Sequence, residues 1–285
     1  MSNYWLGQTN FKRLPAEKIC NSRYSISNKG SCKKIRLLIF AKGKYLKNRL
    51  NKNKMKKPYI ISHMMESVDG RIDCAMTEQI DSSDSYYDAL KDLDCPSQLM
   101  GRVTMQMHYA ENQMYHVNDI SPIGRPSLHK ATEPSGYYTI ALDTRGKLCW
   151  KSNLCDGKPL LVITSEACPG ANLRALERQN ISWIAVGKES IDLERAMDVL
   201  YTDFGVRRLA VTGGGHVNGS FLEKGLIDEV SIMIAPGIDG RSGMTAVFDG
   251  ISPDHNGPTK LRLEKLEQLH DGIVWLRYKV QKEVK

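Results

Sequence analysis

The chain contains the stretch Leu209-Ala-Val-Thr-Gly-Gly-Gly-His-Val-Asn-Gly219, which decides the class of fold. It opens with residues typical of a buried strand, and a helix ended by Gly225 suits the residues after the glycines. Glycines at such a turn let the backbone approach a phosphate, and the unpaired N–H groups of the helix start favour anions. The stretch predicts a strand–turn–helix unit that binds a dinucleotide, or else a flexible turn without a ligand.

Strands and helices alternate through the rest of the chain from Pro58, which predicts an α/β fold with a largely parallel sheet flanked by helices. The segments 260–269 and 273–280, separated by His270-Asp271-Gly272, predict a C-terminal antiparallel hairpin. The other predicted strands are 59–63, 98–101, 137–142, 160–164, 181–186, 207–212 and 230–235, and the predicted helices are 84–94, 102–110, 172–178, 216–224 and one capped by Asp192 that buries Leu193, Met197, Leu200 and Phe204.

Basic and acidic residues are distributed unevenly. Of the 40 basic and 32 acidic residues, residues 1–57 hold 16 basic residues and one acid, Glu17, so residues 58–285 hold 24 basic and 31 acidic residues. The larger segment lacks the basic footprint of a nucleic-acid-binding domain, and we expect no nucleic-acid partner for it. No apolar run approaches the eighteen residues of a membrane span, so we expect no membrane partner.

Residues 1–54 differ from the rest, because they are rich in Lys, Asn and Ser and have only short apolar islands such as 37–40. Three interpretations stay open: a disordered basic extension, a transit peptide, or a leader upstream of a native start at Met55, which we favour. We expect residues 55–285 to form a single domain and residues 1–54 to be a basic, disordered extension.

The seven cysteines are an odd number without a C-x-x-C pair. That composition favours free thiols in a reducing compartment and therefore a cytoplasmic protein. Neither the cysteines nor the histidines have metal-ligand spacing, so we expect no metal site. The signatures of serine hydrolases, zinc proteases and zinc deaminases are absent as well.

Two further turns follow predicted strands, at the ends where ligands gather in open α/β sheets. Gly101-Arg102-Val103-Thr104 places a hydroxyl in the first turn of a helix, where it can cap the helix or contact a phosphate. Met64-Met-Glu-Ser-Val-Asp-Gly70 places the Ser67 hydroxyl and the Asp69 carboxylate in a turn, which could also be an ordinary Asp-Gly turn.

These turns, in this order, resemble a known family. From about residue 57 to 282 the chain resembles the reductase domain of riboflavin biosynthesis, the C-terminal domain of a bifunctional deaminase/reductase, in a stand-alone form. The resemblance implies a dihydrofolate-reductase-like fold, a homodimer, and reduction of a phosphoribosylamino-pyrimidine to its ribitylamino form by NADPH. It rests on residues 65–72, 99–104, 141–146, 211–219 and 225–230, followed by Ala235-Pro236-Gly237 and Gly240.

Carried over residue by residue, the resemblance also implies roles for single positions. Asp69 would be the catalytic group, handling a proton or orienting the substrate, and Ser67 and Thr212 would bind the substrate. Thr212 and His108 stand where the family often has acidic residues. The cofactor would be bound by Met65, Thr104, Thr144, Gly213, Gly214, Gly215, His216, Val217, Asn218, Gly219 and Ser220.

A preference for NADPH over NADH requires polar groups for the 2′-phosphate, and Thr164, Ser165 and Lys188 follow strands where such groups could lie.

Two rival classes of function stay open. One is a dihydrofolate-reductase-like enzyme that acts on another small heterocycle. The other is a non-catalytic nucleotide-binding protein, or a nucleic-acid-binding protein driven by residues 1–57, whose binding would depend steeply on salt.

Overall fold

The computed structural model describes residues 55–80, 84–116, 118–254 and 257–281. They belong to one compact unit that begins at Met55. The expectations about residues 1–54 and about the native start concern residues outside this described part, and they stay predictions.

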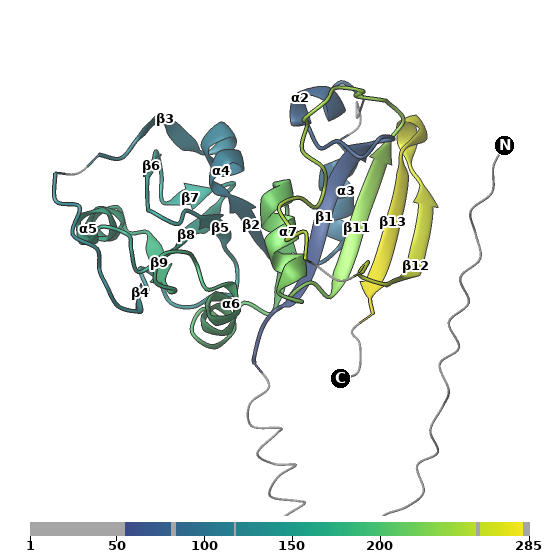
Figure 1. Ribbon diagram of the computed structural model, residues 1–285. Helices are drawn as coiled ribbons and strands as arrows, with labels where there is room; N and C mark the ends of the chain where they lie inside the picture. The colour runs from purple at the N-terminus through teal and green to yellow at the C-terminus, as the bar shows by residue number, and fades with distance from the viewer. Residues whose placement is uncertain (1–54, 81–83, 117, 255–256, 282–285) are drawn as a thin grey trace, which may run out of the picture. The chain divides into compact units, whose positions relative to one another are not determined.

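One large sheet organises the described residues (Figure 1). Its strands follow the order β12-β13-β11-β1-β10-β2-β5-β8-β9-β4, with the short β7 beside β8. All neighbours from β11 to β9 are parallel, whereas β12, β13 and β4 add antiparallel edges. The strands are β1 (Tyr59–Ser67), β2 (Ser97–Gly101), β4 (Ser127–His129), β5 (Thr139–Leu142), β7 (Leu154–Cys155), β8 (Lys158–Thr164), β9 (Ser182–Ala185), β10 (Arg208–Val211), β11 (Glu229–Ala235), β12 (Leu261–Gln268) and β13 (Val274–Val280).

The predicted largely parallel sheet with a C-terminal antiparallel hairpin is therefore confirmed. The antiparallel edge strand β4 and a separate two-stranded sheet, β3 (Ala110–Met114) with β6 (Leu148–Trp150), were not predicted. Within the described residues, the helices are α2 (Cys74–Thr77), α3 (Ser85–Asp92), α4 (Arg102–His108), α5 (Gly170–Arg178), α6 (Leu193–Thr202) and α7 (Gly215–Glu223), with a short 3₁₀ turn η1 (His270–Gly272).

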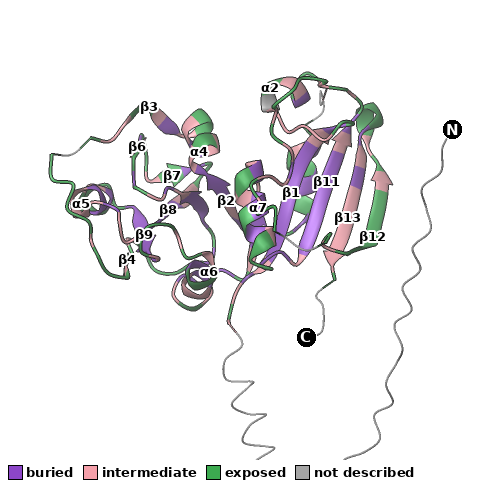
Figure 2. Cartoon of the chain, viewed as in Figure 1, coloured by how far each residue is buried: buried purple, intermediate pink, exposed green. Residues whose placement is uncertain are grey.

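Helices cover both faces of the sheet because successive strand residues point to opposite sides. On β1, for example, Ile60 belongs to a core with residues of α6 and α7, and the next residue, Ile61, belongs to a core with residues of α3. A third core contains Met100 of β2 together with buried residues of α4 and α5. Figure 2 shows the result: the central strands are buried and β12 is largely exposed.

The local signals position the helices as expected. Asp192 caps α6, because its carboxylate accepts a hydrogen bond from the backbone N–H of Arg195 at 3.1 Å. The helix after Gly101 is shorter than predicted, because β3 already begins at Ala110.

None of the helices in the described segments is long and apolar enough to cross a bilayer.

Candidate active site

The glycine loop connects β10 to α7, and its glycines have two different environments. Gly214 has an ordinary φ of −86°, and a Cβ placed on it would meet no atom within 4 Å. A Cβ on Gly215 would lie 2.2 Å from the carbonyl oxygen of Ala246, and one on Gly219 would lie 1.9 Å from that of Asp249. Packing therefore requires Gly215 and Gly219, whereas the space beside Gly214 is open.

Two predicted side chains of α7 contact the segment 247–250 that packs on the helix. Asn218 is buried and donates from Nδ2 to the carbonyl of Val247 at 2.9 Å, and the His216 ring lies against Gly250. Ser220 donates back to the carbonyl of His216 at 2.8 Å. Asn218 and His216 are thus engaged with residues 247 and 250, and their predicted roles in cofactor binding stay predictions. A ligand there would meet backbone N–H groups of the first turn, where α7 has no side-chain cap.

The loop lies beside the start of α4. The N–H of Gly101 donates to the carbonyl of Gly213 at 3.0 Å, and Val217 packs against Gly101. The Thr104 hydroxyl lies near Gly213, because a Cβ built there would be 3.8 Å from Thr104 Oγ1. The contact brings together the two turns that the sequence singled out.

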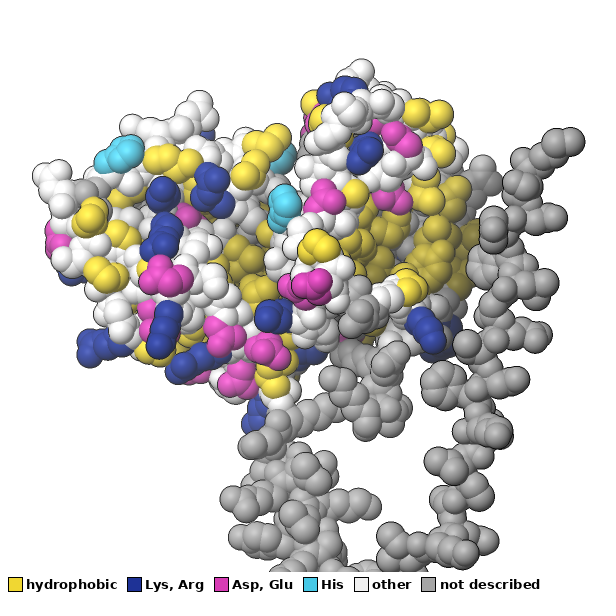
Figure 3. Space-filling view, viewed as in Figure 1, with side chains coloured by type: hydrophobic (Ala, Val, Ile, Leu, Met, Phe, Trp, Pro, Cys, Tyr) yellow, Lys and Arg dark blue, Asp and Glu magenta, His cyan; other side chains and the backbone are white. Residues whose placement is uncertain are grey.

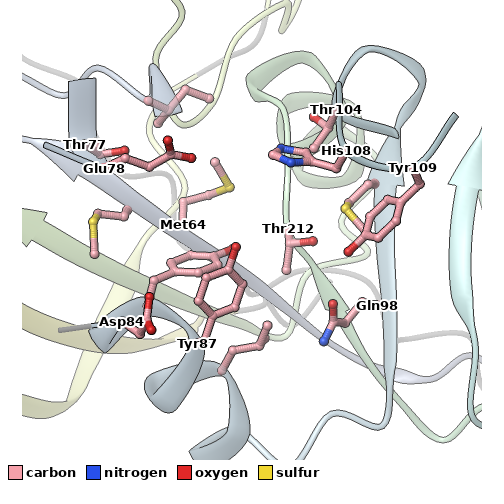
Figure 4. Close-up of a pocket in the computed structure, with 15 residues that line it drawn as sticks. Met64, Thr77, Glu78, Asp84, Tyr87, Gln98, Thr104, His108, Tyr109 and Thr212 are labelled. Atoms are coloured by element: carbon pink, nitrogen blue, oxygen red, sulfur yellow. The ribbon is translucent and has the colours of Figure 1, made fainter. Parts of the chain in front are cut away.

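A cavity of about 180 Å³ opens at the carboxyl ends of β1, β10 and β2, between residues of α3 and α4 (Figure 4). We call it the tyrosine-lined cavity. The predicted residues Met65, Thr104 and Thr212 line it together. The remaining lining residues were not predicted as site residues: Met64, Ile72, Thr77, Glu78, Asp84, Tyr86, Tyr87, Leu90, Gln98, Met100, His108 and Tyr109.

Thr212 is a wall residue with a spare hydrogen-bonding group. Its Oγ1 is buried and has no hydrogen-bond partner among the described residues. A buried hydroxyl without a partner costs free energy, so a ligand that supplies one is favoured. The free hydroxyl therefore supports the predicted role of Thr212 in substrate binding, which stays a prediction.

Two tyrosines of the cavity, Tyr86 and Tyr109, are held in place by neighbouring side chains. Tyr86 stacks on His63 with ring centroids 4.6 Å apart, and its hydroxyl donates to the carbonyl of His63 at 3.3 Å. Burial lowers the pKa of His63 to about 4, so this histidine is neutral at neutral pH. Burial, followed by the hydrogen bond to Asp156, raises the pKa of Tyr109, which therefore stays protonated.

Asp69 lies in the turn after β1, where three donors hold its carboxylate. Ser67 donates to it at 2.6 Å, and the N–H groups of Asp239 and Gly240 each donate at 3.0 Å. The Ser67 hydrogen bond, with those backbone donors, holds the pKa of Asp69 far below its usual range. An ionised carboxylate with these partners has no proton to give at neutral pH. Asp69 is not among the residues that line the tyrosine-lined cavity, so these contacts hold the turn, and its predicted catalytic role stays a prediction.

A second cavity, of about 410 Å³, lies at the carboxyl end of β5 beside the start of α4. We call it the basic cavity. Arg102, Arg145, Lys147 and His116 line it, together with the predicted Thr144. The other lining residues are Met114, Tyr115, Leu142 and Asp143.

The expectation that Thr164 and Ser165 contact a 2′-phosphate is wrong. Both residues are fully buried, and their hydroxyls donate to the carbonyl of Thr144 at 2.9 and 2.8 Å. The sequence could have indicated the basic cavity instead, because Arg102 and Arg145 lie in the turns that carry Thr104 and Thr144. Lys188 is exposed and does not line that cavity.

The mostly parallel sheet flanked by helices, with two cavities at the carboxyl ends of its strands, is an α/β fold of the dihydrofolate-reductase-like class. Within that class the chain belongs to the RibD C-terminal domain family, whose profile matches residues 58–275.

Two curated relatives are named 2,5-diamino-6-ribosylamino-4(3H)-pyrimidinone 5′-phosphate reductase. The one from Archaeoglobus fulgidus is 32% identical over 136 residues, which are 47% of this chain and 59% of that protein. The one from Methanothermobacter thermautotrophicus is 30% identical over 122 residues, 42% of this chain and 56% of that protein. The match thus spans a little over half the length of these relatives.

Solved structures share the fold at lower sequence identity. A pyrimidine reductase-like protein from Corynebacterium diphtheriae has a TM-score of 0.59 at 19% identity, over 79% of this chain and 93% of that chain. The riboflavin biosynthesis reductase Rib7 of Saccharomyces cerevisiae has a TM-score of 0.52 at 16% identity, over 81% and 94%. Likeness at this level of identity establishes the fold alone.

Proposed function

We propose that this chain is an NADPH-dependent reductase that acts on a pyrimidine-type small molecule. The observation that carries the proposal is the arrangement around α4. This helix supplies Arg102 to the basic cavity and Thr104 to the tyrosine-lined cavity, and the glycine loop contacts its start. One elongated anionic cofactor could therefore meet a basic cavity, an open helix start and a cavity for a second molecule.

The residues present suit such a cofactor. The space beside Gly214 admits a pyrophosphate, and the first N–H groups of α7 would hold it. Arg102, Arg145 and Lys147 would hold a 2′-phosphate, since Arg and Lys are the usual partners of phosphate oxygens. NADH lacks that phosphate, so we expect NADPH to bind more tightly.

The cofactor would supply a hydride, and the chain itself supplies orientation and the exclusion of water. Met64 and Met65 give the tyrosine-lined cavity an apolar wall, and the Thr212 hydroxyl can orient a polar heterocycle. The cavity opens to solvent at the exposed side chains of Tyr87 and His108, where water can deliver a proton. No strong acid among the lining residues is then needed.

The curated relatives support the substrate class, because they are named reductases of a ribosylamino-pyrimidinone 5′-phosphate. The matching reaction here would reduce the imine form of a ribosylamino group to a ribitylamino group. Hydride would add to the sugar carbon and a proton to the nitrogen.

The test is absorbance at 340 nm with NADPH and a ribosylamino-pyrimidinone. Stoichiometric loss of NADPH together with formation of the ribitylamino product supports the proposal. NADPH binding with turnover of a different heterocycle would favour the rival reductase. A chain that binds no NADPH contradicts the proposal.

We also propose that the chain forms a homodimer through the outer face of β12 and β13. The leucines Leu261, Leu263 and Leu266 on β12 are 41%, 49% and 65% exposed. They pair with Val280, Tyr278 and Leu276 of β13, and a bulge between Leu263 and Lys265 keeps all three on one face. Figure 3 shows hydrophobic side chains gathered over this side of the sheet.

An exposed apolar sheet face of this kind is typical of an interface. Sedimentation of the full chain should give a dimer, and Leu266→Glu should give a monomer because it places a charge in the apolar contact. A wild-type chain that is monomeric at micromolar concentration contradicts this proposal without affecting the proposed reductase activity.

A further inference from the structure

We propose that His63 is a positioning residue for the substrate, because it fixes the first turn of α3 and the ring of Tyr86 at the wall of the tyrosine-lined cavity. The inference rests on the proposed function, since it concerns how the same cavity holds its second molecule. His63 is fully buried on β1 and is not among the residues that line the cavity. It therefore acts through Tyr86, which does line the cavity, and not on the substrate itself.

Two other elements of the fold contact the ring nitrogens of His63. Nδ1 lies 2.9 Å from Oγ of Ser231 on β11, and Nε2 lies 3.3 Å from the carbonyl oxygen of Tyr86 on α3. Trp275 on β13 donates from Nε1 to the same Ser231 hydroxyl at 2.8 Å. Ser231 and Trp275 are as deeply buried as the histidine, so these hydrogen bonds form in a low-dielectric interior.

The donors and acceptors of this chain of hydrogen bonds have one consistent direction. The indole N–H of Trp275 can only donate and a carbonyl can only accept, so Ser231 accepts from Trp275, and His63 donates from Nε2 to Tyr86. Burial lowers the pKa of His63 to about 4, so the neutral ring has a single N–H. Nδ1 is therefore an acceptor, and the Ser231 hydroxyl donates to it.

Tyr86 contacts His63 in two further ways. Its ring stacks on the imidazole with centroids 4.6 Å apart and an angle of 24° between the ring planes. Its hydroxyl donates to the backbone carbonyl of His63 at 3.3 Å. A change at position 63 therefore alters the support of the Tyr86 backbone and of the Tyr86 ring together.

The start of α3 lacks a side-chain cap that could fix it instead. Asp84 stands at the N-cap position, and its side chain makes no capping hydrogen bond. Asp84, Tyr86 and Tyr87 all line the cavity, and Figure 4 shows Asp84 and Tyr87 on the same side of it. The contacts between His63 and Tyr86 thus position one side of the cavity.

A wall that is fixed in advance favours substrate binding, because ordering it during binding costs conformational entropy. An aromatic ring also attracts a flat heterocycle only at a suitable distance and angle. Loss of the His63 contacts should therefore raise KM. It should leave kcat nearly unchanged, since a change that weakens the bound substrate and the transition state equally does not alter the step between them.

The experiment compares two variants of the full chain with NADPH and the ribosylamino-pyrimidinone 5′-phosphate. His63→Phe keeps a ring on the face of β1 that carries Ile61 and Met65, but it removes both ring hydrogen bonds. His63→Gln places an amide N–H close to the position of Nε2, so it can still donate to Tyr86.

We expect KM to rise about tenfold in His63→Phe and to stay within about threefold of the parental value in His63→Gln. In both variants kcat and the Kd for NADPH should stay near the parental values. A folded His63→Phe protein with the parental KM overturns the inference, and so does an equal rise of KM in the two variants.

Ser231→Ala tests the same chain without a change at His63, and it serves also if His63→Phe does not fold. It removes the hydroxyl that donates to Nδ1, so we expect KM to rise about threefold. Ser182→Ala is the matched control, because Ser182 is also a buried strand serine and does not line the cavity. Its KM should be parental. An equal rise of KM in both variants would reflect a general loss of packing and overturns the inference.

The protonated nitrogen of His63 separates this inference from the proposed function. Nitrogen-15 NMR of the chain at pH 7, without ligand, should show a neutral ring protonated at Nε2. Protonation at Nδ1 overturns the inference even if the heterocycle is reduced. If the ring is protonated at Nε2 but the parent does not reduce the heterocycle, the proposed function fails. The Kd of the heterocycle in the complex with NADP⁺ then replaces KM, and a Kd that His63→Phe leaves unchanged, or no binding at all, overturns the inference.

Discussion

The two cavities that flank α4 have opposite character. The basic cavity gathers Arg102, Arg145 and Lys147, whereas the tyrosine-lined cavity has Glu78 and Asp84 and no Lys or Arg among its lining residues in the described part of the chain. An anion in the first cavity would be attracted, and an anion in the second would be repelled. The two cavities therefore differ in the charge of the side chains that line them.

The largest effect is expected from Gly214→Val, because the glycine loop serves the cofactor side of this contrast. The new side chain would occupy the open space beside the helix start, and φ of −86° allows it without backbone strain. Losing two charge-assisted hydrogen bonds, each worth roughly 1.5–3 kcal/mol, would weaken NADPH binding by about a hundredfold or more. Calorimetric titration measures this loss.

Gly214→Ala is the matched control for that variant, with a smaller expected loss of affinity. The melting temperatures of both variants should stay near that of the parent, because no described atom lies within 4 Å of the added Cβ. Parental NADPH affinity in a folded Gly214→Val protein would mean that the loop is only a connector.

The next largest effect is expected from Thr212→Val, which tests substrate binding in the tyrosine-lined cavity. Thr212→Val keeps the shape of the side chain and removes the hydroxyl that has no partner in the described structure. We expect kcat/KM for the substrate to fall by about tenfold, the value of one hydrogen bond of about 1.4 kcal/mol. The Kd for NADPH and the melting temperature should not fall. A parallel loss of NADPH affinity would assign Thr212 to the wrong ligand.

A pH effect tests the support behind the tyrosine-lined cavity. The pKa of His63 is about 4 in the fold and 6.5 ordinarily, so the unfolded chain takes up a proton first as pH falls. Stability is therefore complete above pH 6.5 and decreases as pH falls toward 4, by about 2 kcal/mol between pH 7 and 5. Urea unfolding at both pH values should show this loss in the parent. His63→Asn, which cannot titrate there, should show a smaller one.

The smallest effect is expected from deleting residues 1–54. We predict nearly unchanged melting temperature and NADPH affinity for a chain that starts at Met55, because the deleted segment has little apolar material for a core. Thermal unfolding and calorimetry of the shortened protein measure both quantities. A fall of several degrees in melting temperature would show that the extension contributes to the fold.

Sequence reasoning was strongest where a feature is local. Short runs of apolar and β-branched residues predicted the central strands, and Asp192 predicted the start of α6, because strand burial and helix capping depend on a few neighbouring residues. The short strands β4 and β6 were missed, since three residues are too few to show a period.

The site was predicted less completely, because its residues come from separate elements. Met65, Thr104 and Thr212 were assigned roles and do line one cavity, but Gln98, Tyr86 and Asp84 carry no motif of their own. The roles of the glycines were also hidden. Only the packing of residues 245–249 distinguishes Gly215 and Gly219 from Gly214.

We propose that the basic cavity holds the phosphate that distinguishes NADPH from NADH. The most direct test is titration of both cofactors into the parent chain and into a double variant, Arg102→Ala with Lys147→Ala, which removes two cations from that cavity. We predict that the parent binds NADPH at least about tenfold more tightly, and that the variant loses this preference while its Kd for NADH stays near the parental value. Equal affinities for the two cofactors in the parent, or an equal loss of both in the variant, would contradict the claim.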